Sequence, residues 1–219
     1  MSPQLMIQSV NIVILGSLNP AIFQPSWLAS NKLIKYSEAE NVQLEIVHPQ
    51  IAKFSTEWFL LNVSAGRFQV ATTQEPYYEP LRDLVIGIFS LLRHTPVTAL
   101  GINQEFHYSI ESEKKWHKIG DSLAPKTPWE SVLSTPRMLN IIMKGERSDD
   151  YKGYILAKIE PSPRETFGIF ISVNDHYELP SDNSGNVDGA INILKEQWTE
   201  SMQRGVKVAH KIAKLGEDK

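Results

Sequence analysis

Apolar and polar positions alternate along this chain in runs that predict an ordered series of strands and helices. Residues 11–16 form an apolar run of strand length that closes at a glycine and is followed by an Asn-Pro turn signal. The clearest strand pattern spans residues 100–110, where one side is apolar and the other polar. Its apolar side contains Leu100, Ile102, Phe106, Tyr108 and Ile110, and its polar side contains Gly101, Asn103, Glu105, His107 and Ser109.

Further runs predict a half-buried strand at residues 43–47 and a hairpin of residues 58–63 and 67–72 joined by a short loop. Later in the chain, residues 138–143, 153–159 and 167–173 predict three strands that follow one another as a meander.

Helical spacing of apolar residues predicts a short helix after Pro25 and a longer one over residues 81–92. Ser112 has the position of an N-cap for a helix whose inner side carries Trp116, Ile119 and Leu123. Thr127-Pro128 combines a capping residue with a proline at the first helical position and predicts another short helix. From Val187, apolar residues recur every three or four positions and predict one helix of about 27 residues, with Asn186 as its N-cap.

These elements predict an α+β fold in which a mainly antiparallel sheet is covered on one side by helices and ends in a long C-terminal helix. We expect a single domain over residues 1–219, with a disordered tail at residues 216–219.

The order strand, helix, three strands, helix occurs twice, in residues 10–95 and again in residues 97–215. One interpretation is a βαβββα unit that is repeated. The other is an ordinary α+β domain, because the halves share little beyond the match of Leu15-Gly16 with Leu100-Gly101 and a nearby asparagine.

Composition excludes several classes of chemistry. The chain has no cysteine, which excludes a disulfide framework, a thiolate metal site and a cysteine nucleophile. A net charge of -3 offers no overall basic surface for nucleic acid. The first basic residue is Lys32 and the longest apolar stretch, residues 84–92, is short, so we expect neither a secretory signal nor a membrane span. A cytoplasmic protein without a cofactor is the expectation.

Two polar clusters are the candidates for catalysis or ligand binding. Asp175, His176 and Glu178 follow a predicted strand and combine an imidazole with carboxylates. Glu105 and His107 share the polar side of the strand at residues 100–110. Convergence of both clusters in one cleft would give a two-histidine site for metal-assisted hydrolysis, but each cluster is also explained as an ordinary solvated strand end or strand face. No metal site is therefore assigned.

Large aromatic side chains in proline-stiffened segments are candidates for partner binding, since they lose little entropy on contact. The candidates are Phe23, Trp27, Tyr77 and Tyr78. The alternative is that they close the ends of the hydrophobic core.

The pattern lacks a Gly-x-Ser-x-Gly elbow and a phosphate-binding loop, so no catalytic motif identifies an enzyme. We expect a non-enzymatic protein-interaction module, such as an adaptor, an antitoxin-like inhibitor or an accessory subunit, which binds another protein or a second copy of itself. The alternatives are a small-ligand-binding protein or a hydrolase using the histidine and carboxylate clusters. Nucleic-acid binding through Lys207, Lys211 and Lys214 is the least expected of the classes.

Overall fold

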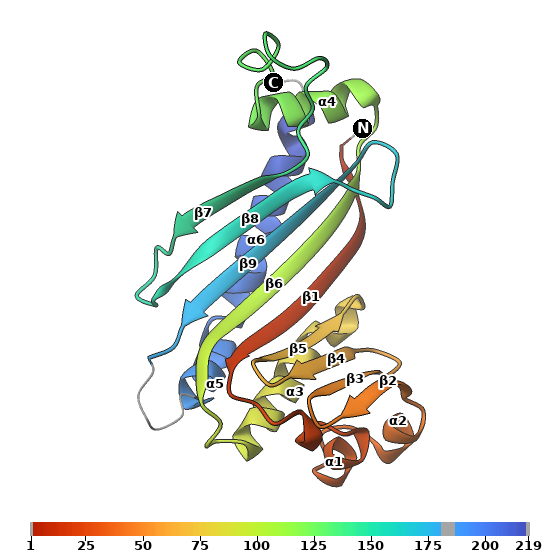
Figure 1. Cartoon of the computed structure of the whole chain (residues 1–219), viewed down its shortest axis with the longest axis vertical. Helices are drawn as coiled ribbons and strands as arrows, with labels where there is room; N and C mark the ends of the chain where they lie inside the picture. The colour runs from red at the N-terminus through yellow and green to blue at the C-terminus, as the bar shows by residue number, and fades with distance from the viewer. Residues whose placement is uncertain (1, 181–186, 218–219) are drawn as a thin grey trace.

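Nine strands form one antiparallel sheet in the computed structural model, which describes residues 2–180 and 187–217 (Figure 1). The spatial order of the strands is β2-β3-β4-β5-β1-β6-β9-β8-β7. The strands are β1 (Gln4–Gly16), β2 (Gln43–His48), β3 (Ile51–Ser55), β4 (Leu60–Ser64), β5 (Arg67–Thr72), β6 (Val97–Ser109), β7 (Ile141–Glu146), β8 (Gly153–Pro161) and β9 (Gly168–Glu178).

The two longest strands, β1 and β6, lie side by side at the centre of the sheet and pair along almost their whole length. Each also pairs with the last strand of the meander that follows it, β1 with β5 and β6 with β9. Alternation along β1 buries Val10, Ile12 and Ile14 completely on one face and turns Asn11 to the other. One face of the central strands is therefore the core face, and the other, called the polar face below, carries mainly polar side chains.

Helices pack on the core face. In the first half, α3 (Tyr78–Leu91) contacts β1 and β5, and in the second half α6 (Trp198–Ala213) contacts β6 and β9 behind the sheet (Figure 1). The remaining elements are η1 (Pro20–Ile22), α1 (Pro25–Ser30), α2 (Tyr36–Glu40), η2 (Glu75–Tyr77), α4 (Glu113–Leu123), α5 (Val187–Glu196) and η3 (Lys214–Gly216). The antiparallel α+β architecture expected from the sequence is confirmed.

Close contact between α6 and the sheet depends on a buried polar side chain. Gln104 lies on the core face of β6 among apolar residues, and its Nε2 donates a hydrogen bond to the carbonyl oxygen of Ser201 at 3.0 Å. Gly205, one turn further along α6, has no side chain at the point where the helix crosses Gln104. A Cβ atom there would lie 2.0 Å from Gln104 Nε2.

Several sequence predictions are confirmed. Residues 100–110 have the predicted apolar and polar sides, and the hairpin β4–β5 and the meander β7–β8–β9 are both present. Ser112 caps α4 by accepting a hydrogen bond from the backbone N–H of Lys115, and Ile119 is buried on the predicted inner side.

The predicted helix after Thr127 is wrong. Residues 124–140 form turns and loops, and Trp129 in this segment is exposed. Pro125, Pro128 and Pro136 interrupt the segment, and a short helix without a face to bury is not stable in water. The capping residue and proline at Thr127-Pro128 favour a helix start locally, but burial of an apolar face does not stabilise a helix here.

The single C-terminal helix is also corrected, because Gln197 separates α5 from α6. The break lets α5 pack against α3 while α6 packs along β6 and β9. The predicted cap Asn186 lies outside the described residues. Gly216, which we assigned to a disordered tail, is buried in η3 against α4.

Strand β3 was not predicted. Its five residues are bounded by turns, and so short a run gives a weak alternation signal.

Candidate interaction surface

Strand β7 lies at one edge of the sheet and pairs only with β8 among the described strands. All of its residues except Ile141 are exposed. Ile142 is 55% exposed and Met143 is 59% exposed, and the strand alternation places them on opposite faces. An exposed apolar edge strand presents unpaired backbone groups and is a template for pairing with another chain.

The segment that leads into β7 is rich in exposed apolar side chains as well. We call residues 124–140 the arm; it crosses the end of the sheet near α4 before it enters β7 (Figure 1). Its exposed apolar residues are Trp129, Val132, Leu133 and Leu139. Together the arm and β7 hold six of the 13 exposed large apolar residues in the described part of the chain. This segment is therefore the part of the described chain where exposed apolar side chains are most concentrated.

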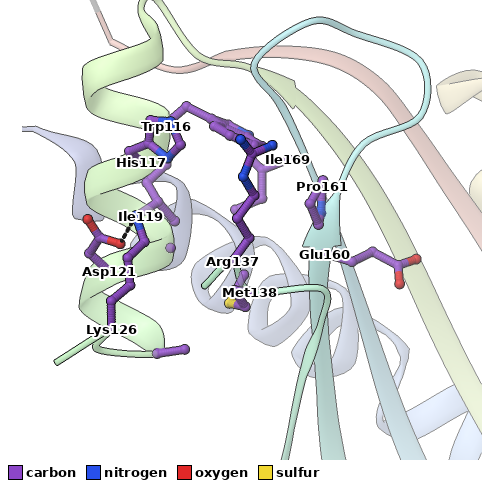
Figure 2. Close-up of a pocket in the computed structure, with 12 residues that line it drawn as sticks. Trp116, His117, Ile119, Asp121, Lys126, Arg137, Met138, Glu160, Pro161 and Ile169 are labelled. Carbon is purple, nitrogen blue, oxygen red and sulfur yellow. Dashed lines mark ion pairs between the residues drawn. The ribbon is translucent and has the colours of Figure 1, made fainter. Parts of the chain in front are cut away.

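Beneath the arm lies a small apolar pocket of about 50 Å³ (Figure 2). Its walls come from α4, the arm and the adjoining ends of β8 and β9, and include Trp116, Ile119, Met138, Pro161 and Ile169. The Trp116 indole is fixed in place because Nε1 donates a hydrogen bond to the carbonyl oxygen of Gly168 at 2.9 Å. The apolar walls of the pocket suit an apolar side chain of a partner.

Two cations border this pocket. Lys126 forms an ion pair with Asp121 at 2.9 Å. The Arg137 side chain extends along the pocket toward Trp116 (Figure 2). The rim of the surface is therefore polar around an apolar centre, which is the composition usual for protein interfaces.

The predicted histidines, His107 and His176, share the polar face but do not converge. His176 pairs with Gly101 of β6, and His107 lies six residues further along that strand, where it pairs with Phe170. Six residues of strand correspond to about 20 Å. Within residues 2–180 and 187–217, no group of three or more histidine and carboxylate side chains could hold a metal ion. A hydrolase site that contains both His107 and His176 is therefore excluded.

His107 and Glu105 have local hydrogen-bond partners. His107 Nδ1 lies 2.8 Å from Ser162 Oγ at the turn after β8, and Glu105 accepts a hydrogen bond from Ser9 Oγ at 3.0 Å. Burial lowers the pKa of His107, and the nearby Arg164 lowers it further, while Glu105 opposes the shift. A neutral imidazole bonded to a turn hydroxyl positions that turn on the sheet.

Asp175 lies apart from His176 and Glu178, because alternation turns it to the core face. There it is 1% exposed and accepts hydrogen bonds from the guanidinium groups of Arg147 and Arg204. This placement corrects its assignment to a catalytic cluster: Asp175 is a buried partner of two cations.

Arg147 is the second centre of this buried charge cluster. Besides Asp175 it binds Asp149 through Nη2 and Oδ2 at 2.6 Å, and its guanidinium carbon lies 3.7 Å from the ring centroid of Tyr177. The hydrogen bond from Arg147 lowers the pKa of Asp149. The cluster joins the loop between β7 and β8 to β9 and α6, so it holds the edge of the sheet in place.

Sequence reasoning missed this cluster, although a signal was present. Ile171, Val173 and Tyr177 alternate on the core face of β9, and Asp175 occupies a position in the same series. A carboxylate at a core position requires a cation or several hydrogen-bond donors. What the sequence did not show was which arginines would reach it.

The aromatic candidates for partner binding are mostly parts of the core. Phe23 is completely buried and packs on Phe68, with ring centroids 5.6 Å apart. Tyr78 is buried too; its hydroxyl donates to the carbonyl oxygen of Gln8 at 3.2 Å, and burial raises its pKa to about 12. This corrects the expectation for both residues, since neither side chain is accessible to a partner.

Trp27 and Tyr77 are half-buried. Trp27 packs beside Phe23, and Tyr77 stacks on Trp58 with ring centroids 5.1 Å apart. These contacts attach the helical segments of the first half to its sheet, and partner binding by Trp27 and Tyr77 stays a prediction.

Comparison with known proteins adds no assignment. No protein-family model matches the chain, and no curated protein sequence matches it. Among the helices of the described residues, none is long and apolar enough to cross a membrane. Any functional assignment therefore has to come from the geometry of the chain itself.

Proposed function

We propose that this protein is a non-enzymatic interaction module, an adaptor, inhibitor or accessory subunit in the cytoplasm, that binds another protein through β7 and the arm. The exposed apolar edge of β7 is the observation that carries the proposal. Charged Lys144 and Glu146 protect the second half of the edge, whereas Ile142 and Met143 leave its first half apolar, and a partner that covers this half explains its composition.

Strand addition is the mode of binding that the geometry of β7 favours. An extended segment of the partner would continue the sheet beyond β7 through backbone hydrogen bonds. Because Ile142 and Met143 lie on opposite faces, apolar side chains of the added strand would find a neighbour on each side. Leu139, two residues before β7, would extend this apolar contact along the chain. The partner is thus a protein with an exposed strand of alternating apolar residues.

The double substitution Ile142→Lys and Met143→Lys is expected to abolish this complex without unfolding the protein. Charged side chains on an edge strand oppose pairing, whereas exposed positions tolerate substitution within about 0.5 kcal/mol. Native mass spectrometry of the protein isolated gently from its own cells measures the partner and its stoichiometry. Leu91→Lys is the matched control, because Leu91 is similarly exposed at 51% but lies on α3.

We expect a stoichiometric partner protein with the wild type and the Leu91→Lys variant, and its loss with the double variant. A partner that stays bound to the double variant would place the interface elsewhere. A lone chain in all samples would contradict the interaction function, and a mass of twice the chain would identify a second copy as the partner.

We also infer that the two halves are a duplicated βαβββα unit. In support, β1 and β6 meet at the centre, and the meander after each returns to pair with it, although the first half has an additional strand. The sequence match of Leu15-Gly16 with Leu100-Gly101 does not support the duplication, because the two leucines lie on opposite faces of the sheet. Leu100 lies in the core, whereas Leu15 borders a cavity of the polar face. The support is topological.

A further inference from the structure

Three asparagines lie directly opposite one another on the polar face of the three central strands. Asn11 of β1 pairs with Asn103 of β6, and Asn103 pairs in turn with Asn174 of β9. They line a cavity of about 270 Å³ that also includes Gly101 and His176. A row of carboxamides in the middle of a sheet offers hydrogen-bond donors and acceptors in a regular array.

A slot opens next to this row, above Gly101. In the adjacent row of paired residues, Val13 of β1 lies opposite Gly101, and Gly101 lies opposite His176. Strands are about 4.8 Å apart, so the backbones that carry Val13 and His176 are roughly 10 Å apart, and Gly101 between them has no side chain of its own. The amides of Asn103 and Asn174 border this space from the adjacent row. One flat ring with contacts of about 3.5 Å on either side fits this width.

One wall of the slot is a fixed aromatic ring. The His176 imidazole stacks on Tyr154 of β8, with centroids 4.4 Å apart and an interplanar angle of 24°. Lys144 lies over Tyr154, with its Nζ 4.1 Å from the ring centroid. Because one face of the imidazole meets Tyr154, its other face is directed toward β6 and the space above Gly101.

The amides at the floor of the slot are only weakly hydrogen-bonded within the protein. Asn174 Oδ1 is buried and has no hydrogen-bond partner among residues 2–180 and 187–217. Asn103 Nδ2 makes only long contacts of 3.4 Å, to the carbonyl oxygens of Asn11 and Gly101. A Cβ at position 101 would lie 3.2 Å from Asn103 Nδ2 and 3.4 Å from Asn174 Oδ1, so both amides reach the slot. A buried acceptor without a donor is costly, and a ligand N–H would satisfy it.

The charged groups of the cavity are engaged at its ends. Glu105 accepts a hydrogen bond from Ser9, and Arg67 donates one to Gln69 Oε1 at 3.1 Å. Burial lowers the pKa of His176, against the opposing effect of Glu178, which favours the neutral imidazole. The centre of the cavity is therefore polar and uncharged, and it favours a neutral ligand over an ion.

We propose that the slot above Gly101 binds a neutral planar heterocycle that carries an N–H donor beside a hydrogen-bond acceptor, the edge presented by a nucleobase. The ring stacks on His176, its N–H donates to Asn174 Oδ1, and its acceptor receives Asn103 Nδ2. Side-chain amides recognise base edges in this bidentate manner in other proteins. The site lies on the polar face of the central strands, and β7 reaches it only through Lys144, which lies over Tyr154.

Isothermal titration calorimetry with adenosine, guanosine, cytidine and uridine, each added separately to the whole protein, tests the proposal. We expect at least one nucleoside to bind one to one, with a Kd of about 1 mM or tighter. Asn174→Leu keeps the shape of the side chain but removes its hydrogen bonds, and should weaken binding about tenfold. Asn103→Ala is a second variant with the same expected direction.

Asn62→Leu on β4 is the matched control, since it removes an asparagine of the same sheet outside the cavity, and binding should not change. D-ribose tests whether the sugar alone is recognised. The proposal is overturned if no nucleoside binds, if D-ribose binds as tightly as the best nucleoside, or if the cavity variants bind as the wild type does.

Discussion

Replacing Asp175 with alanine is expected to destabilise the protein by about 3–5 kcal/mol, the loss typical when one partner of a buried ion pair is removed. The substitution leaves Arg147, whose side chain is 2% exposed, without its buried carboxylate, and it also removes a partner of Arg204. Urea denaturation followed by circular dichroism measures the free energy of unfolding.

Glu178→Ala is the control for this prediction, because Glu178 lies on the same strand but is exposed, and its loss should cost within about 0.5 kcal/mol. Asp175→Asn keeps one acceptor oxygen, enough for one of the two arginines, and should fall between the two. If Asp175→Ala matched Glu178→Ala in stability, the cluster would not hold β7, β9 and α6 together as we infer.

Replacing Gly205 with alanine is expected to cost about 2 kcal/mol of stability, within the range for overpacking in a core. Alanine ordinarily favours a helix by about 1 kcal/mol over glycine, so the sign of this effect is diagnostic. The added Cβ would lie 2.5 Å from Gln104 Cδ, which forces Gln104 or the whole of α6 to move. The hydrogen bond from Gln104 to Ser201 would be lost with that movement.

Gly120→Ala is a matched control on α4, because a Cβ at position 120 meets no atom of the described residues within 4 Å. It should stabilise the protein by up to about 1 kcal/mol through helix propensity. The loss of unfolding free energy in the double variant Gly205→Ala, Gln104→Ala should be smaller than the sum of the losses in the two single variants. The reason is that truncating Gln104 makes room for the new methyl group. Strict additivity in thermal or urea unfolding would show that the two residues do not compete for space.

Much of the secondary structure was predictable because its signals are local. The alternation of β6 and the capping of α4 by Ser112 follow from residues a few positions apart. Failures arose where packing overrides local preference. The start signal at Thr127 is intact, yet no helix forms there, and the apolar stripe after Val187 is divided at Gln197 so that its two parts cover different elements.

The candidate sites show the same division. Sequence placed His176 and Glu178 on one side of a strand and Asn103 and His107 on one side of another, and the structure has both pairs on the polar face. It could not show that His107 and His176 are six register positions apart. Nor could it show that the aromatic candidates Phe23 and Tyr78 are buried, while apolar residues of the arm are exposed.

By itself, the sequence determined which side of each element is apolar and hence that helices would pack on an antiparallel sheet. This information is local, because side-chain direction repeats every two residues in a strand and every 3.6 in a helix. Only the tertiary structure decided the strand order, which brings Asn11, Asn103 and Asn174 into one row and Arg147 and Arg204 to Asp175. Contacts between residues so far apart in the chain depend on the order in which all the strands pair. The short-range periodicity of the sequence is compatible with many strand orders.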